Sequence, residues 1–240
     1  MGKEVSGVVH RVAPDHLMVY VDTGLMGYVC PADIDGIASL AEISKKYHEG
    51  DKVTGTVLNQ WTDPSMVNFS LLKSHDAYRV RCLIVDEFDD CVMLRVSGNR
   101  PGIMYCTDVC DPSSWTSYPL RNLSKGMIID ATILGETHAK PGHQPNIIVT
   151  MRDDIDAIHH YQLNEGDLVH GFVVRIEQDN VVIRLNYNMI RYIPNRFVYG
   201  NADSSPELKV GEMVVGRVIV SMKGKRTLSL LVFSWILTYS

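Results

Sequence analysis

Arginines stand beside aromatic residues in the last third of the sequence. A planar ring stacks on a nucleic-acid base and a cation neutralises a phosphate, so this combination is typical of a surface that binds single-stranded nucleic acid. The candidate RNA-binding residues are Arg184, Arg191, Tyr192, Arg196, Lys223, Lys225 and Arg226, with Tyr105 and Arg95 as a smaller group in the middle of the chain. We predict that the residues of the last third form one basic face with interleaved rings, completed by Phe197.

A structural interpretation of the same residues stays open. Tyr192 and Phe197 also suit packing inside a barrel or against a neighbouring unit, and Arg184 and Arg191 also suit a solvated strand. The charge distribution favours binding, because residues 161–240 hold nine basic and seven acidic residues whereas the whole chain has a net charge of −5. The last third is the only part with a positive balance.

Catalytic and metal-binding patterns are absent from the sequence. It has no G-x-S-x-G, P-loop, H-E-x-x-H or Rossmann glycine motif, so we expect neither an enzyme nor a cofactor. The adjacent His159 and His160 lie near Asp153, Asp154 and Asp156. Adjacent histidines point apart, and a polar linker therefore explains this group better than a metal site.

The cysteines and the apolar runs indicate the compartment. Five cysteines form no C-x-x-C pair, which predicts free thiols in a reducing, intracellular environment. No apolar run approaches the ~20 residues that a membrane span needs, so we expect no membrane partner.

A glycine-valine pattern recurs along the chain and organises these residues. The form G-x-x-V-x-G-x-V begins at Gly2, Gly50, Gly166 and Gly211, and looser copies occupy 77–84 and 126–133. The copies pair at nearly constant separation, and a short strand-like run ending in a hydroxyl residue follows each second copy. This regularity predicts three tandem units at 1–74, 77–153 and 163–235.

Each unit is rich in strand signals and poor in helix signals. Valine and isoleucine alternate with polar residues or run continuously between glycine and aspartate turns. In the first unit we expect strands at 3–12, 17–21, 27–31, 52–59 and 66–71. Five strands per unit, with a glycine where a strand must bend, predict small closed barrels joined by short linkers. The expected fold is all-β.

The spacing of these motifs resembles the RNA-binding repeat of ribosomal protein S1, an OB-fold barrel. A closer resemblance is to the ribosomal RNA processing protein 5 family, on the series Gly102–Val109, Asp111, Trp115, Pro119–Leu120 and Gly126. This resemblance implies three tandem S1-motif barrels, a nuclear or nucleolar location, and ribosomal RNA or its precursor and ribosome-assembly proteins as partners. It also implies that the chain is a fragment or a reduced relative of that family.

The S1 resemblance assigns ligand positions to each unit. Strong members of that family carry two phenylalanines, a histidine and an arginine at these positions. The first unit has Asp15, Met18, Cys30 and Met66 there, the second has Asp90, Met93, Tyr105 and Asn146, and the third has Asp179, Val182, Pro194 and Lys225. The first unit therefore lacks the usual rings and cation, and we expect its RNA site to be lost. The second retains one ring, Tyr105, and we expect a marginal site there. The third retains only a cation, Lys225, at these positions, but we expect it to be the chief contact because of the arginines and rings on its strands 2 and 3.

The sequence supports three functions of different classes. The leading hypothesis is a non-enzymatic RNA-binding module of a ribosome-biogenesis factor. The first alternative is a protein-binding scaffold of degenerate repeats, which the acidic first two units favour. The second alternative is an accessory RNA-binding piece of a nuclease or translation factor, because the same barrel occurs in many proteins.

Overall fold

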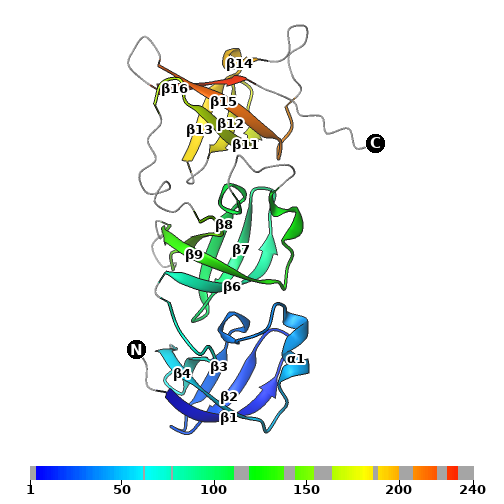
Figure 1. Cartoon of the computed structure of the whole chain (residues 1–240), viewed down its shortest axis with the longest axis vertical. Helices are drawn as coiled ribbons and strands as arrows, with labels where there is room; N and C mark the ends of the chain where they lie inside the picture. The colour runs from blue at the N-terminus through cyan, green and yellow to red at the C-terminus, as the bar shows by residue number, and fades with distance from the viewer. Residues whose placement is uncertain are drawn as a thin grey trace. The chain divides into compact units, whose positions relative to one another are not determined.

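Among the residues that the structure describes, the regular secondary structure is almost entirely β-strand (Figure 1). The computed structural model describes residues 4–61, 63–76, 78–110, 119–137, 144–153, 164–185, 189–199, 208–220 and 226–231. Within these ranges the one α-helix is the short α1 (Ile43–Lys46), and no helix is long and apolar enough to span a membrane. The all-β prediction is confirmed.

The first barrel contains five strands in the order β1-β2-β3-β5-β4 and is closed. Its strands are β1 (Glu4–Val12), β2 (Leu17–Val21), β3 (Met26–Val29), β4 (Lys52–Gln60) and β5 (Met66–Ser70). The connection after β3 holds the 3-10 turns η1 (Pro31–Asp33) and η2 (Leu40–Glu42) and then α1. Only β3 and β5 pair in parallel, and this five-stranded arrangement is that of an OB-fold barrel.

The second barrel repeats this arrangement in the order β10-β8-β7-β6-β9. Its strands are β6 (Arg79–Glu87), β7 (Cys91–Val96), β8 (Arg100–Tyr105), β9 (Ile128–Glu136) and β10 (Ile147–Thr150). The 3-10 turns η3 (Cys106–Asp108) and η5 (Pro119–Asn122) lie between β8 and β9. Parallel pairing of β8 with β10 closes the barrel, as β3 and β5 close the first.

The third part is a six-stranded sheet in the order β13-β12-β11-β15-β16-β14. Its strands are β11 (Leu168–Ile176), β12 (Asn180–Leu185), β13 (Met189–Pro194), β14 (Val198–Tyr199), β15 (Met213–Val220) and β16 (Arg226–Leu231), with η6 (Asn195–Phe197) between β13 and β14. The parallel partner of β16 is β14, not β13. This sheet therefore differs from the closed five-stranded barrel that the sequence predicts.

A single position in the third strand explains this difference. The barrels have a glycine at this position, where a side chain would be crowded. A Cβ on Gly27 in β3 would lie 3.0 Å from Phe69 Cβ, and a Cβ on Gly102 in β8 would lie 2.6 Å from Val96. Arg191 occupies this position in β13, because it pairs with Ile183 as Gly27 pairs with Val19. A guanidinium group is costly to bury, so β13 stays at the edge of the sheet.

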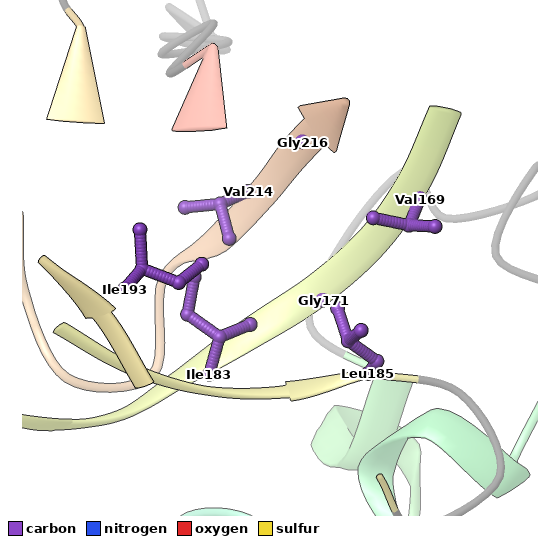
Figure 2. A pocket seen from close by; sticks show the side chains of 7 residues that line it. All are labelled: Val169, Gly171, Ile183, Leu185, Ile193, Val214 and Gly216. Atoms are coloured by element: carbon purple, nitrogen blue, oxygen red, sulfur yellow. The ribbon is translucent and has the colours of Figure 1, made fainter. Parts of the chain in front are cut away.

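Apolar side chains on the inner faces of the strands form the cores. In the first barrel Leu17, Val19 and Phe69 are fully buried. In the third sheet Val169, Ile183, Leu185, Ile193 and Val214 lie around one narrow space (Figure 2). These cores fix which strand residues point outward.

The chain divides into two compact units. The first comprises Met1–Phe88, Val92–Met104 and Asn122–Met151, and the second comprises Asp89–Cys91, Tyr105–Arg121 and Arg152–Ser240. The three predicted domain ranges stay a prediction, because this division cuts across the second barrel.

Candidate nucleic-acid interface

The described residues of the predicted basic face of the third sheet do not form one surface. Arg191 and Tyr192 are neighbours in β13, and successive residues of a strand point to opposite faces. Tyr192 pairs with Val182 and is exposed, whereas Arg191 lies on the same side as the buried Ile193. Only one of these two residues can therefore lie on a given face.

The structure places the predicted RNA-binding residues Arg184 and Tyr105 in contact with each other. The Arg184 guanidinium lies 3.9 Å from the centroid of the Tyr105 ring, and its Nη2 lies 2.8 Å from Asp90 Oδ2. Its side chain is only 10% exposed. A phosphate would have to displace Asp90 to reach it.

Of the remaining candidates in the last third, the structure describes Arg196 and Phe197 and the backbone of Arg226. Arg196 and Phe197 belong to the 3-10 turn η6 rather than to a strand, because β13 ends at Pro194, which has no amide hydrogen to continue the ladder. Arg196 is exposed and lies 5.0 Å from the Phe197 ring centroid. Lys223, Lys225, His159 and His160 lie outside the described residues, and of Arg226 only the backbone, at the start of β16, is described.

The first barrel instead presents a cluster of rings that sequence reasoning missed. Leu17, Val19 and Val21 point into the core, so the alternate residues of β2 and β3 point outward, among them Tyr28. His16 stacks on Tyr28, with ring centroids 5.0 Å apart and an angle of 22° between the ring planes. The Trp61 ring centroid lies 5.3 Å from that of Tyr28, with an angle of 50° between the planes. We call Tyr28, His16 and Trp61 the ring cluster.

Hydrogen bonds hold the outer members of the ring cluster in place. Trp61 Nε1 donates to Asn68 Oδ1 at 2.8 Å, and Asn68 Nδ2 donates in turn to Asn59 Oδ1 at 2.8 Å. Asn68 is buried in β5 and pairs across from Tyr28, so it holds the indole on the outer side of the barrel. His16 Nδ1 lies 2.8 Å from Asp15 Oδ1, which orients the imidazole.

The electrostatics of Tyr28 favour the neutral phenol. Burial raises the pKa of Tyr28 to about 12, helped by nearby Cys30 and Asp15 and opposed by the positive charge of Arg95. Tyr28 therefore keeps its proton at neutral pH and can donate a hydrogen bond. The exposed Arg95 of β7 acts on Tyr28, so this predicted cation belongs with the ring cluster and not with Tyr105.

The ring cluster supplies what single-stranded nucleic acid needs from a protein surface. Tyr28 lies on β3, His16 directly precedes β2 and Trp61 directly follows β4. Strands 2 and 3, with the loops between strands 1–2 and 4–5, are the common ligand face of an OB barrel. The rings of the cluster can stack on bases, the Tyr28 hydroxyl can donate to a base or phosphate, and Arg95 can neutralise a phosphate.

The signal for the ring cluster was present in the sequence. Tyr20 and Tyr28 each follow an outward methionine by two residues, Met18 and Met26, and this alternation places them on one face. The S1 resemblance directed attention to Cys30 instead. Trp61 follows β4 and nothing in its local sequence predicts its contact with Tyr28.

The comparisons with known proteins show no family for this chain. No protein-family model and no curated protein matches the chain. Among solved structures it is similar to a multidomain protein with nucleic acid binding domains from Streptococcus pneumoniae, at 14% identity and a TM-score of 0.26, covering 95% of this chain and 72% of that one. It is also similar to Drosophila Unr CSD456, at 14% identity and a TM-score of 0.20, covering 98% of this chain and 99% of that one.

A third similarity covers a single part of the chain. The uncharacterized protein MJ1198 from Methanocaldococcus jannaschii has 16% identity and a TM-score of 0.26, covering 31% of this chain and 93% of that one. The strand order of the two closed barrels defines the class of protein, which is a tandem OB-fold protein.

Proposed function

We propose that the chain is a non-enzymatic module that binds single-stranded RNA on the outer face of the first barrel. The observation that carries this proposal is the ring cluster of Tyr28, His16 and Trp61, with Arg95 beside it. A half-buried set of contacting rings within electrostatic range of a cation can bind bases and phosphates, and OB barrels bind nucleic acid on this face.

We extend the proposal to ribosomal RNA and its precursors as the ligand and to a nuclear or nucleolar site of action. Its support is the resemblance of the repeats to the ribosomal RNA processing protein 5 family. The similar Streptococcus pneumoniae protein, described as having nucleic acid binding domains, agrees with the broader class of ligand.

Removing a ring from the cluster is expected to weaken RNA binding without changing its salt dependence. Tyr28→Ala and Trp61→Ala should each cost roughly 1–3 kcal/mol of binding free energy, because each removes one stacking partner and no charge. Fluorescence anisotropy of a labelled single-stranded RNA, titrated with the full chain across a salt series, measures both quantities. Circular dichroism checks that each variant is folded.

A matched control separates stacking from a general loss of aromatic surface. Tyr78→Ala removes a ring that is 73% exposed and outside the ring cluster, and it should leave the affinity unchanged. Arg95→Ala should instead reduce the slope of log affinity against log salt by about one, since it removes one phosphate contact. If folded Tyr28→Ala and Trp61→Ala chains bind RNA as tightly as the parent, the protein-scaffold alternative becomes the better explanation.

A further inference from the structure

A polar cavity lies where the chain passes from the first barrel to the second. The segment 72–76, between β5 and β6, forms one side of it, and Asp35, residues 79–81 and Ser97 form the rest. All of these residues belong to the first compact unit. The cavity volume of about 470 Å³ lies within the range of roughly 300–1,000 Å³ that is usual for small-molecule sites.

Two arginines reach this cavity because they alternate with buried residues in β6. Val80 and Cys82 are buried, so Arg79 and Arg81 lie together on the outer face of the strand. The strand therefore places two guanidinium groups on one side of the cavity.

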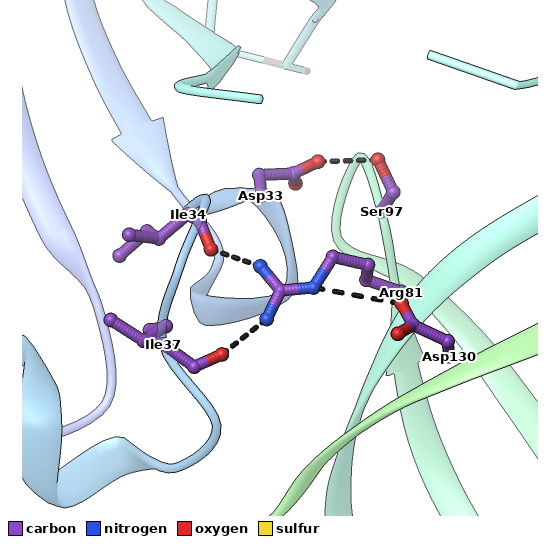
Figure 3. A network of polar contacts seen from close by, with 6 residues as sticks. All are labelled: Asp33, Ile34, Ile37, Arg81, Ser97 and Asp130. Carbon is purple, nitrogen blue, oxygen red and sulfur yellow. Dashed lines mark hydrogen bonds and ion pairs between the residues drawn. The ribbon is translucent and has the colours of Figure 1, made fainter. Parts of the chain in front are cut away.

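Arg81 forms a fixed wall. Its Nη1 and Nη2 donate to the backbone carbonyl groups of Ile34 and Ile37, and its Nε lies 3.8 Å from Asp130 Oδ1 (Figure 3). Its side chain is only 18% exposed. Since its donors are already used, Arg81 shapes the cavity and adds charge, part of which Asp130 offsets.

Ser97 completes the wall beside Arg81. Its Oγ donates to the buried Asp33, which also accepts a hydrogen bond of 2.8 Å from the Gly98 amide (Figure 3). Burial raises the pKa of Asp33, and a positive charge on His75 opposes that rise. His75 therefore lies within electrostatic range of this wall.

The donors that are open to a ligand are the side chains of Arg79, Lys73, His75 and Ser74. All four residues are exposed, and within the described part of the chain the Arg79 and His75 side chains form no hydrogen bond. Lys73 Nζ lies 3.9 Å from Asp35 Oδ2, and both side chains are well exposed. An exposed pair of this kind stabilises little, so Lys73 can turn to a bound anion.

The carboxylates of the lining are both engaged. Asp76 Oδ1 accepts hydrogen bonds from the Tyr78 and Arg79 amides, at 2.8 and 3.2 Å, and these bonds lower the pKa of Asp76. Asp35 lies beside Lys73. The cavity thus keeps converging donors for an anion, and its carboxylates already have partners.

We propose that this cavity binds a phosphate ester of a nucleotide, with Arg79 and Lys73 as its charged contacts. The guanidinium of Arg79 matches two phosphate oxygens, and the Lys73 ammonium supplies a point charge. His75 and Ser74 can donate to the remaining oxygen, which a carboxylate ligand lacks, and Leu72 adds apolar surface for the sugar or base. This site is separate from the ring cluster and does not depend on RNA binding there.

NMR titration of the full chain with uridine 5′-monophosphate tests this site. Amide signals of 72–76 and 79–81 should shift with one saturating dependence on concentration, while signals of the third sheet stay in place. Uridine without phosphate should leave all of them unchanged. Arg79→Ala and Lys73→Ala should each raise the Kd by about tenfold or more, because each removes a charge-assisted contact.

Matched controls make the same substitutions outside the cavity. Arg11 and Lys52 are exposed in the first barrel, so Arg11→Ala and Lys52→Ala should leave the Kd unchanged. Tyr28→Ala, which weakens RNA binding by the ring cluster, should also leave it unchanged. Failure of one site is thereby distinguished from failure of the other.

A second titration distinguishes two sources of the phosphate. A short oligouridine with hydroxyl ends carries phosphodiesters only, whereas uridine monophosphate carries a monoester. Shifts of 72–76 with the mononucleotide assign a free nucleotide as the ligand, and shifts with the oligonucleotide alone assign the RNA backbone. The site is refuted if neither ligand shifts these signals, if uridine shifts them equally, or if Arg11→Ala weakens binding as much as Arg79→Ala.

Discussion

Replacing Gly55 by alanine is expected to lower the free energy of unfolding of the first barrel by about 3 kcal/mol or more. A Cβ at this position would lie 2.1 Å from the carbonyl oxygen of Ser70 and 2.9 Å from the Phe69 ring. Ser70 pairs with Thr56 in the ladder between β4 and β5. Relief therefore requires a shift of backbone at the closure of the barrel, which a side-chain rotation cannot provide.

Native-state hydrogen exchange of the full chain measures this effect locally. Amides of 52–60 and 66–70 should lose protection in Gly55→Ala, while those of the third sheet keep theirs. Thr54→Ala changes the exposed neighbour of Gly55 in the same strand and should alter the opening free energy by no more than about 0.5 kcal/mol. Equal protection in Gly55→Ala and the parent chain would show that β5 accommodates the methyl group.

The repeated glycines mark the barrel strands, but the structural reason for them is not the strand bend that we expected from the sequence. A sharp bend at the glycine was expected, yet the register of β1 shifts between Val9 and Arg11, beyond Gly7. Gly7 is needed because a Cβ there would lie 2.6 Å from Val19, and one on Gly171 would lie 2.5 Å from Ile183. Close approach of neighbouring strands makes these glycines necessary, so the pattern locates the barrel strands correctly.

Strand positions could be predicted from the sequence because alternation and glycine spacing are local signals. Contacts between residues distant in the chain, such as that of Trp61 with Tyr28, could not, because they form through the packing of loops. Arg184 and Asp90 are an example, since nothing near either residue indicates the other. The open third sheet, in contrast, could have been predicted from the sequence. Arg191 stands at the strand position that Gly27 and Gly102 occupy in the two barrels, and comparing these three residues would have indicated it.

Asp108→Asn is expected to stabilise the chain at neutral and alkaline pH but not at acid pH. Asp108 is fully buried in η3, and burial raises its pKa from 3.8 to about 7 despite the attraction of Arg152 and Arg184. Between these two values the unfolded chain binds fewer protons than the folded chain, so the stability of the parent falls as pH rises. One pKa unit corresponds to about 1.4 kcal/mol, which sets an upper limit of about 4 kcal/mol for the whole window. Asparagine has a similar shape and no charge to bury, so the variant avoids this loss.

Urea unfolding at a series of pH values, followed through the NMR signals of Cys106–Asp108, measures the difference between the two chains. It should be close to zero near pH 4, grow in favour of Asp108→Asn up to about pH 7, and stay constant above that. Asp63→Asn provides a control of opposite sign, because hydrogen bonds from Ser65 lower the pKa of the exposed Asp63 and thereby stabilise its charged form. That variant should lose stability at neutral pH and match the parent in acid. A difference between Asp108→Asn and the parent that does not vary with pH would mean that Arg152 and Arg184 offset the cost of burying the Asp108 charge.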